Sequence, residues 1–299
     1  MHVIEAGRRV FLKEILFLTD FSEPSEAAIP FVIGLAREYG ARACALHVLT
    51  PVTLGYASPE SAAATIEGIE DDVQAQMQLI DSQLAGVDHE TMTIRGESVW
   101  SGVEKVLADR KVDLLIVGTH GRTGAMKLML GSVAEEIFRR ATVPVLTIGP
   151  SVQKGVHGGG QFHHVMLATD FTPEARAAAP YAISMAQEHL AKLLLLHVMR
   201  NPDSKVAGRT AEDSVANMMH ELYEIVPVAA ELWCRPEAMV RYGSPAEQIL
   251  EVAHEHEVDL IVLGVRDAAG HLRAATHLER TTAHKVAAHA TCPVLTVRG

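Results

Sequence analysis

The chain has 299 residues, 48% of them hydrophobic and 21% charged, which is enough for one large or two medium globular domains with apolar cores. Its net charge of −11 and its scattered Lys and Arg residues argue against nucleic acid or an anionic membrane as a partner. The isolated Cys44, Cys234 and Cys292 lack metal-binding spacing, and no apolar run approaches the roughly 18 residues that span a bilayer. Lys13 and Glu14 interrupt the first apolar run, so we expect no signal peptide and a soluble, cytoplasmic protein.

Short apolar runs alternate with amphipathic segments in the first half of the chain. The apolar runs predict five strands, at residues 15–18, 43–49, 91–94, 114–117 and 145–148. The segments between them predict four helices, at residues 25–39, 61–84, 99–110 and 133–140, with Ser22 as the N-cap of the first. Strands that alternate with helices form a parallel sheet covered on both faces, so we predict an α/β fold.

The same series of motifs returns in the second half of the chain. Thr19-Asp20-Phe21 returns as Thr169-Asp170-Phe171, and the Leu-His-Val of residues 46–48 returns at 196–198. The Val-Asp-Leu of residues 112–114 returns at 258–260, and the Pro-Val-Leu-Thr of residues 144–147 is matched by Pro-Val-Leu-Thr at 293–296. A glycine-rich stretch separates the copies. We therefore predict a first domain at 1–150, a linker at 151–162 and a second domain at 163–299, whose first helix follows Thr172 as N-cap.

A glycine loop follows the fourth predicted strand and leads into a helix. Gly118 and Gly121 would let phosphate oxygens approach the backbone, and Gly131 would open the start of the helix, where Ser132 can donate its hydroxyl. Ser132-x-x-Glu135 is also a capping-box pattern. The charge of Glu135 near a polyphosphate would require compensation by Arg122, Lys127 or a divalent ion such as magnesium. A strand-to-helix turn that merely needs glycine is the alternative interpretation, but the spacing and the placement favour a phosphate site.

With these motifs the chain resembles a tandem universal stress protein over nearly all of its length. The resemblance implies two doubly wound domains, each with a five-stranded parallel sheet in the strand order 3-2-1-4-5. We further expect the closing strands, at residues 143–148 and 292–297, to pair, so that the two copies pack as an intrachain pseudo-dimer. An unpaired apolar edge strand is an aggregation risk, which such pairing removes. The sequence leaves open whether whole chains form a homodimer.

The resemblance also implies an adenine-nucleotide site in the first copy. ATP-binding members of the family carry Gly-x2-Gly-x9-Gly-Ser/Thr, which this copy matches. By this resemblance Asp20 would contact the nucleoside end, Val48 would meet the adenine edge through its backbone, and Val133 would offer a further N–H group. Asp20 also suits a hydrogen-bonded turn, since the second copy keeps Asp170. The residues assigned to the site are Asp20, Val48, Val117, Gly118, Gly121, Arg122, Gly131, Ser132 and Val133.

The second copy departs from this pattern. Its Gly264-Val265-Arg266-Asp267 places an acid where the first copy has Gly121, and either His277-Leu278 or Arg280-Thr281 stands opposite Gly131-Ser132. A carboxylate beside phosphate is repulsive, so we expect no ATP in the second copy. The second copy could still bind a different anion through its arginines, Arg266, Arg273 and Arg280.

These observations favour an ATP-binding stress-response regulator that holds one nucleotide in its first copy and offers its second copy as a scaffold or as a surface for an unknown protein partner. The alternatives are a slow ATP hydrolase on the same fold and a nucleotide-free interaction module. We assign no catalytic residue, because no Gly-x4-Gly-Lys-Ser/Thr loop, Ser-Gly-Gly-x-Asp-Ser loop or nucleophile–base set is evident. We assign no metal ligand either, since His254 and His256 are two apart on a predicted helix and do not share a face.

Overall fold

A computed structural model describes residues 9–51, 62–119, 130–152, 160–199, 211–228, 230, 236–266 and 281–299. The chain divides into two compact units, one made of residues 12–148 and the other of residues 149–299 together with the first eleven residues. Among the described residues, no helix has the length and hydropathy needed to cross a membrane.

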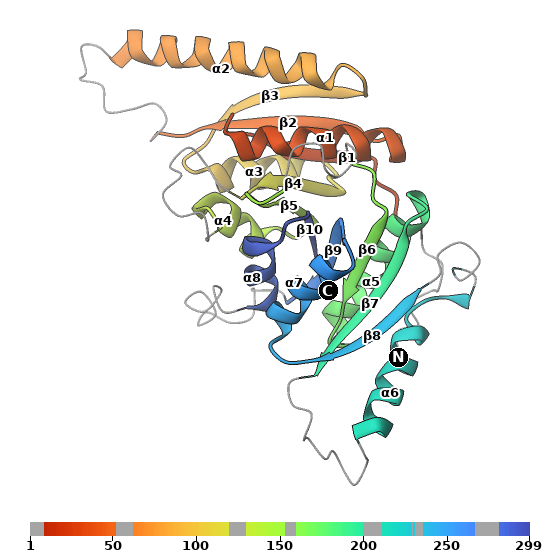
Figure 1. Ribbon diagram of the computed structural model, residues 1–299. Coiled ribbons are helices and arrows are strands. Elements are labelled where there is room, and N and C mark those ends of the chain that lie inside the picture. The colour runs from red at the N-terminus through yellow and green to blue at the C-terminus, as the bar shows by residue number, and fades with distance from the viewer. Residues whose placement is uncertain are drawn as a thin grey trace. The chain divides into compact units, whose positions relative to one another are not determined.

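The first unit contains a parallel five-stranded sheet (Figure 1). Its strands are β1 (Glu14–Leu18), β2 (Arg42–Leu49), β3 (His89–Arg95), β4 (Leu114–Gly118) and β5 (Val145–Ile148). Their order is β3-β2-β1-β4-β5, and each pairing is parallel. The predicted strands and the predicted order are confirmed. The central strands β1 and β4 are buried almost throughout, whereas β3, at the edge, is only half-buried.

Four helices of the first unit connect these strands. They are α1 (Glu23–Tyr39), α2 (Ala62–Leu84), α3 (Val99–Asp109) and α4 (Ser132–Arg140). The side chain of Val48 in β2 lies against Gly102 of α3, whereas its neighbour Leu49 lines a groove with residues of α2. Successive side chains of a strand point to opposite faces of the sheet. Hence α2 and α3 cover opposite faces, as the doubly wound prediction requires.

The second unit repeats this architecture. Its strands are β6 (His164–Ala168), β7 (Lys192–Met199), β8 (Glu237–Tyr242), β9 (Leu260–Val265) and β10 (Val294–Arg298). Its helices are α5 (Pro173–Glu188), α6 (Ala211–Glu224), α7 (Pro245–Glu255) and α8 (Thr282–His289). The order β8-β7-β6-β9-β10 is again the predicted 3-2-1-4-5 order. Thr172 is the N-cap of α5, and its hydroxyl accepts the N–H of Ala175 at 3.3 Å.

The repeated Val-Asp-Leu motif ties two strands together in each unit. The Asp113 carboxylate accepts the N–H groups of Lys13 and Glu14, at 2.8 and 3.0 Å, where β1 begins. In the second unit, Asp259 does the same for His163 and His164, at 2.7 and 3.0 Å. The acid thus satisfies backbone donors at the start of the sheet, which accounts for its presence in both copies.

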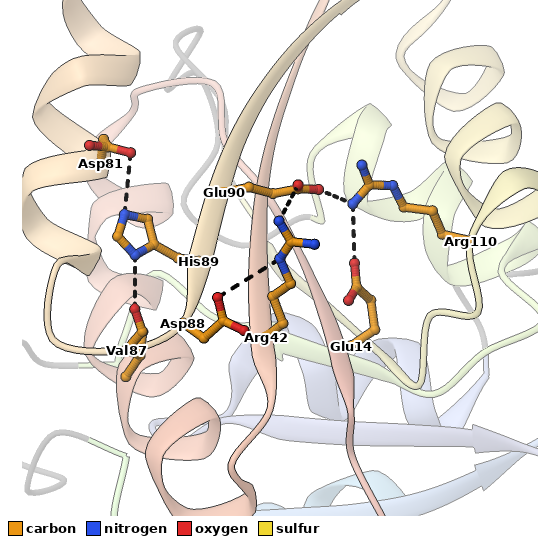
Figure 2. Close-up of polar contacts among 8 residues, drawn as sticks. All are labelled: Glu14, Arg42, Asp81, Val87, Asp88, His89, Glu90 and Arg110. Atoms are coloured by element: carbon orange, nitrogen blue, oxygen red, sulfur yellow. Dashed lines mark hydrogen bonds and ion pairs between the residues drawn. The ribbon is translucent and has the colours of Figure 1, made fainter.

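A chain of ion pairs joins the amino ends of three strands in the first unit (Figure 2). Arg110, which follows α3, pairs with Glu14 of β1 at 3.2 Å and with Glu90 of β3. Arg42 of β2 pairs with the same Glu90 at 2.6 Å and with Asp88 at 4.0 Å. These charges lie at the amino ends of the strands, the edge opposite to that where ligands of parallel sheets bind.

The described N-terminal residues belong to the second unit. The guanidinium of Arg9 donates to both carboxylate oxygens of Glu188, at 2.5 and 2.6 Å. The N–H of Val10 donates to the Ser184 hydroxyl at 3.2 Å. Both partners are in α5, so the start of the chain is fastened to the unit that the end of the chain builds.

Candidate nucleotide site

The carboxyl edge of the first sheet gathers most of the predicted site residues. Asp20 follows β1, Val48 lies near the end of β2, Gly118 ends β4, and Gly131 directly precedes α4. Parallel strands end at one edge, where a doubly wound sheet binds its ligands. Gly121, Arg122 and Lys127 lie outside the described residues, which omit 120–129.

Asp20 organises the turn between β1 and α1. Its Oδ1 atom accepts the Ser22 N–H at 3.1 Å, the Ser22 hydroxyl at 2.5 Å and the Ser25 hydroxyl at 2.6 Å. Ser22 is the N-cap residue as predicted, but its side chain bonds to Asp20 and makes no cap hydrogen bond. In the second unit Asp170 accepts the N–H and the hydroxyl of Thr172, at 3.2 and 2.6 Å. The turn role considered for Asp20 is therefore confirmed in both copies.

The Thr-Asp-Phe and Leu-His-Val motifs meet in the first unit. His47 is buried, and its Nδ1 atom lies 2.8 Å from the carbonyl oxygen of Thr19. The Phe21 ring stacks on the His47 ring at 4.4 Å between centroids. Phe21 has a φ of 62°, a backbone conformation that residues other than glycine rarely adopt. The histidine contact thus supports a strained turn beside the site.

The second unit repeats this contact, with Nδ1 of His197 at 2.9 Å from the Thr169 carbonyl oxygen and with Phe171 at φ 62°. The Phe171 and His197 rings lie 4.8 Å apart. The sequence motifs alone predicted no role for either histidine. The signal that could have revealed the contact was the shared 150-residue offset of the two motifs.

The backbone groups of Val48 point away from β3, at the carboxyl end of β2. The Leu46 carbonyl accepts the Thr19 N–H, and the Leu49 carbonyl accepts the Gly96 N–H, both at 3.0 Å. Successive residues in a strand direct their backbone groups to alternate sides. Val48 therefore turns its N–H and C=O toward the β1 side of β2, beyond Leu18, the last residue of β1. Sheet pairing between these two strands stops before that point.

Gly118 has a packing role that needs no ligand. A Cβ atom at Gly118 would lie 2.9 Å from the carbonyl carbon and oxygen of Pro24, in the first turn of α1. At Gly264, the counterpart in the second unit, a Cβ atom would lie 2.3 Å from the carbonyl oxygen of Glu174. Close helix packing therefore accounts for glycine at the end of this strand in both copies. Val117, one residue earlier, is buried between β1 and β5.

The start of α4 differs from the predicted capping box. Gly131 is the N-cap, and its N–H donates to the Thr119 carbonyl at 2.5 Å, which places the first helical residue at Ser132. The prediction that Ser132 caps the helix and that Glu135 completes a box is wrong, because this tertiary bond fixes the helix start one residue earlier. Since glycine has no side chain, the N–H groups of Ser132 and Val133 begin the helix without a side-chain cap. The Val133 side chain is 38% exposed.

The corresponding helix of the second unit begins with its own cap. Thr281 is the N-cap of α8, and its hydroxyl accepts the His284 N–H at 3.2 Å. The side chain thus occupies the third N–H of α8, whose counterpart in α4 is the Ala134 N–H, and it closes a first turn that in α4 has no side-chain cap. Asp267, His277, Arg273 and Arg280 lie outside the described residues. Among the residues that the structure describes, no three His, Cys, Asp or Glu side chains are grouped so that they could hold a metal ion.

Comparison with known proteins decides the family. The model of the universal stress protein family matches twice, over residues 12–149 and 161–298. The chain belongs to the universal stress protein family. Universal stress protein MJ0577 of Methanocaldococcus jannaschii is 26% identical over 155 residues, which cover 46% of this chain and 96% of that protein. A universal stress protein of Thermus aquaticus is 33% identical over 141 residues, which cover 46% of this chain and 99% of that protein.

A solved structure supports the fold over both repeats. The crystal structure of a universal stress protein from Archaeoglobus fulgidus aligns with 95% of this chain and 98% of its own, with a TM-score of 0.71 and 20% identity. The two curated relatives each match less than half of this universal stress protein. It is a tandem member, with one family domain in each half.

Proposed function

We propose that this tandem universal stress protein is a cytoplasmic, ATP-binding regulator of the stress response that holds one nucleotide in its first repeat. The second repeat then serves as a scaffold or as a surface for a protein partner. The glycine motif of the first repeat matches that of ATP-binding family members, and this match supports the proposal that the first repeat binds a nucleotide. The chain's acidic net charge of −11 supports a mode in which backbone N–H groups, rather than a basic surface, hold the phosphates.

One observation carries this proposal: the contrast between the starts of α4 and α8. In α4 the N-cap is Gly131, so no side chain accepts an N–H of the first turn, and the Ala134 N–H is offered to an anion together with those of Ser132 and Val133, at the positive end of the helix dipole. In α8 the side chain of Thr281 accepts the N–H of His284. The two helices otherwise occupy the same place in the two sheets.

The remaining contacts of the nucleotide follow from the same edge of the sheet. We place the phosphates between Gly118, Gly121 and the start of α4, with Val117 forming the buried strand beneath them. The nucleoside end would face Asp20, and the adenine edge would meet the outward backbone groups of Val48.

Charge compensation completes the proposed site. Glu135 lies in the first turn of α4, where its carboxylate would repel a polyphosphate. We therefore assign Arg122, together with a magnesium ion carried by the nucleotide, to offset the negative charge.

The experiment adds a side-chain cap to the start of α4 and, as a separate variant, removes the side-chain cap from the start of α8. Gly131→Thr should reproduce the α8 cap, because the backbone at Gly131, with φ −60° and ψ 152°, suits a side chain. Thr281→Gly is the matched control, since it opens the helix start in the repeat that we propose to be empty. Calorimetry with ATP should give one site per chain in the wild type and in Thr281→Gly, and at least about tenfold weaker affinity in Gly131→Thr.

The control measurements separate the alternatives. Thermal melting should show that Gly131→Thr is as stable as the wild type or more stable, so that weaker binding is not a folding defect. Nucleotide identified after heat release supports ATP binding, and its absence together with a lack of calorimetric binding would favour the nucleotide-free module. A time course of phosphate release at rates above those of free ATP would favour the slow hydrolase. Two equivalent calorimetric sites would contradict the assignment to the first repeat alone.

A further inference from the structure

A groove of about 590 Å³ lies between α2 and the edge strand β3 in the first unit. Its floor contains the buried side chains of Val73 and Met77. One wall is a stripe along α2 that includes the exposed Gln74 and Gln78. The other wall is β3. Figure 1 shows α2 running alongside β3 at the outer edge of the sheet, away from the carboxyl-edge site of α4.

The backbone of β3 directs hydrogen-bonding groups outward, on the side away from β2. The Asp88 carbonyl accepts the Ala43 N–H at 2.9 Å, and β3 pairs with β2 alone among the described strands. Because backbone groups alternate in direction along a strand, Thr91, Thr93 and Arg95 turn their N–H and C=O groups away from β2. The side chains of the same three residues line the groove. Donors and acceptors therefore recur at every second residue along one wall, which is the pattern that an extended peptide matches.

An ion pair and a hydrogen-bond contact of a histidine link α2 and β3 at two places along the groove. Arg95 pairs with Glu70. The imidazole of His89 lies 3.2 Å from Asp81, as Figure 2 shows. These contacts join the helix to both ends of the strand. Between them the outward N–H and C=O groups of Thr91 and Thr93 lie beside the groove.

The charge of α2 indicates what the groove would accept. The helix contains five Asp or Glu residues and no Lys, Arg or His; Arg95 of β3 pairs with one of these acids, Glu70, so the charge beside the groove remains negative. A second copy of this chain would bring an identical acidic helix to the same edge, where like charges repel. A basic segment would be attracted, and its backbone would satisfy the outward groups of β3.

We propose that the groove between α2 and β3 binds an extended, basic peptide segment of a partner protein, which adds to the sheet as a further strand beside β3. Alternate side chains of that segment would lie over the apolar floor at Val73 and Met77. The other side chains would carry the positive charge that the acidic helix attracts. This site is separate from the nucleotide site, and the proposal does not depend on ATP binding.

The test uses the full chain and a labelled peptide that alternates lysine and valine and has the length of β3. Thr93→Pro removes an outward N–H and adds ring atoms at the edge, but it leaves the pairing with β2 intact because this N–H does not face β2. Thr93→Val is the matched control, since it keeps the N–H and the net charge. Fluorescence anisotropy should show at least about tenfold weaker binding for Thr93→Pro and nearly unchanged binding for Thr93→Val. A peptide with glutamate in place of lysine should bind at least about tenfold more weakly to the wild type.

A second measurement, on the wild type, tests the proposal without the proline variant and so does not depend on whether that variant folds. The peptide should slow hydrogen exchange at the N–H groups of Thr91, Thr93 and Arg95, which have no sheet partner among the described strands, more than at Met92 and Ile94, which face β2. Equal binding by the two Thr93 variants, equal binding of the acidic peptide, or unchanged exchange at the outward groups would overturn the proposal. Self-association that sedimentation detects in the wild type but not in Thr93→Pro would identify a second copy as the occupant and would also overturn it.

Discussion

Replacing His189 by leucine should stabilise the second unit, and more so as the pH falls. His189 follows the last residue of α5, and its ring lies against Phe162 at 4.9 Å between centroids. Both ring nitrogens are buried and find no hydrogen-bond partner among the described residues. Burial lowers the pKa of His189 to about 4, against an opposing contribution from Glu188. Leucine removes two unsatisfied polar atoms, which is worth about 1–3 kcal/mol near neutral pH.

The pH dependence follows from the proton balance of the two states. In the unfolded chain His189 binds a proton near the ordinary histidine pKa. In the folded chain, whose His189 pKa is about 4, it binds that proton only at lower pH. The wild type therefore loses stability as the pH falls through this interval, by a total of about 3 kcal/mol. The leucine variant lacks this loss, so its advantage over the wild type should grow by the same amount.

Urea unfolding followed by circular dichroism, at a series of pH values, measures this advantage directly. The difference between variant and wild type cancels the contributions of the other titrating groups. His220→Gln is the control, because it removes a histidine whose side chain is 76% exposed and leaves the buried His189 in place. A difference between His189→Leu and wild type that stays constant or shrinks toward acid pH would refute the reasoning.

Two further predictions concern glycines. Gly264→Ala should lower the free energy of unfolding by about 2–3 kcal/mol, because the new Cβ would lie 2.3 Å from the Glu174 carbonyl oxygen. Gly118→Ala should lower it by less, because its Cβ would lie 2.9 Å from the Pro24 carbonyl group. Thermal melts that rank the two variants in the opposite order would contradict this. Gly121→Asp, which copies the acid of the second repeat, should abolish ATP binding in calorimetry while costing less than about 2 kcal/mol of stability; wild-type ATP affinity in this variant would show that the phosphate site is misplaced.

The strands were predictable because parallel strands buried on both faces leave continuous apolar runs, as in residues 114–117, whereas their order followed from the family resemblance. The start of α4 was not predictable from local pattern, since the bond from Gly131 to Thr119 overrides the Ser-x-x-Glu motif. The packing role of Gly118 depends on α1, which is distant in sequence. The groove beside β3 depends on which stripe of α2 faces the strand, and an edge strand with polar residues gives little periodic signal.

The fastening of the first residues to α5 has a consequence for dissecting the protein. Although the repeats follow one another in sequence, the first unit is topologically an insertion, joined covalently to the other unit at both of its ends. The Glu188 side chain is only 10% exposed, and its cation is Arg9, at the opposite end of the chain. A fragment cut at the repeat boundary would leave that carboxylate without its guanidinium. We therefore expect an isolated second repeat to be less stable than one to which the N-terminal segment is restored, by circular permutation or as a separate peptide.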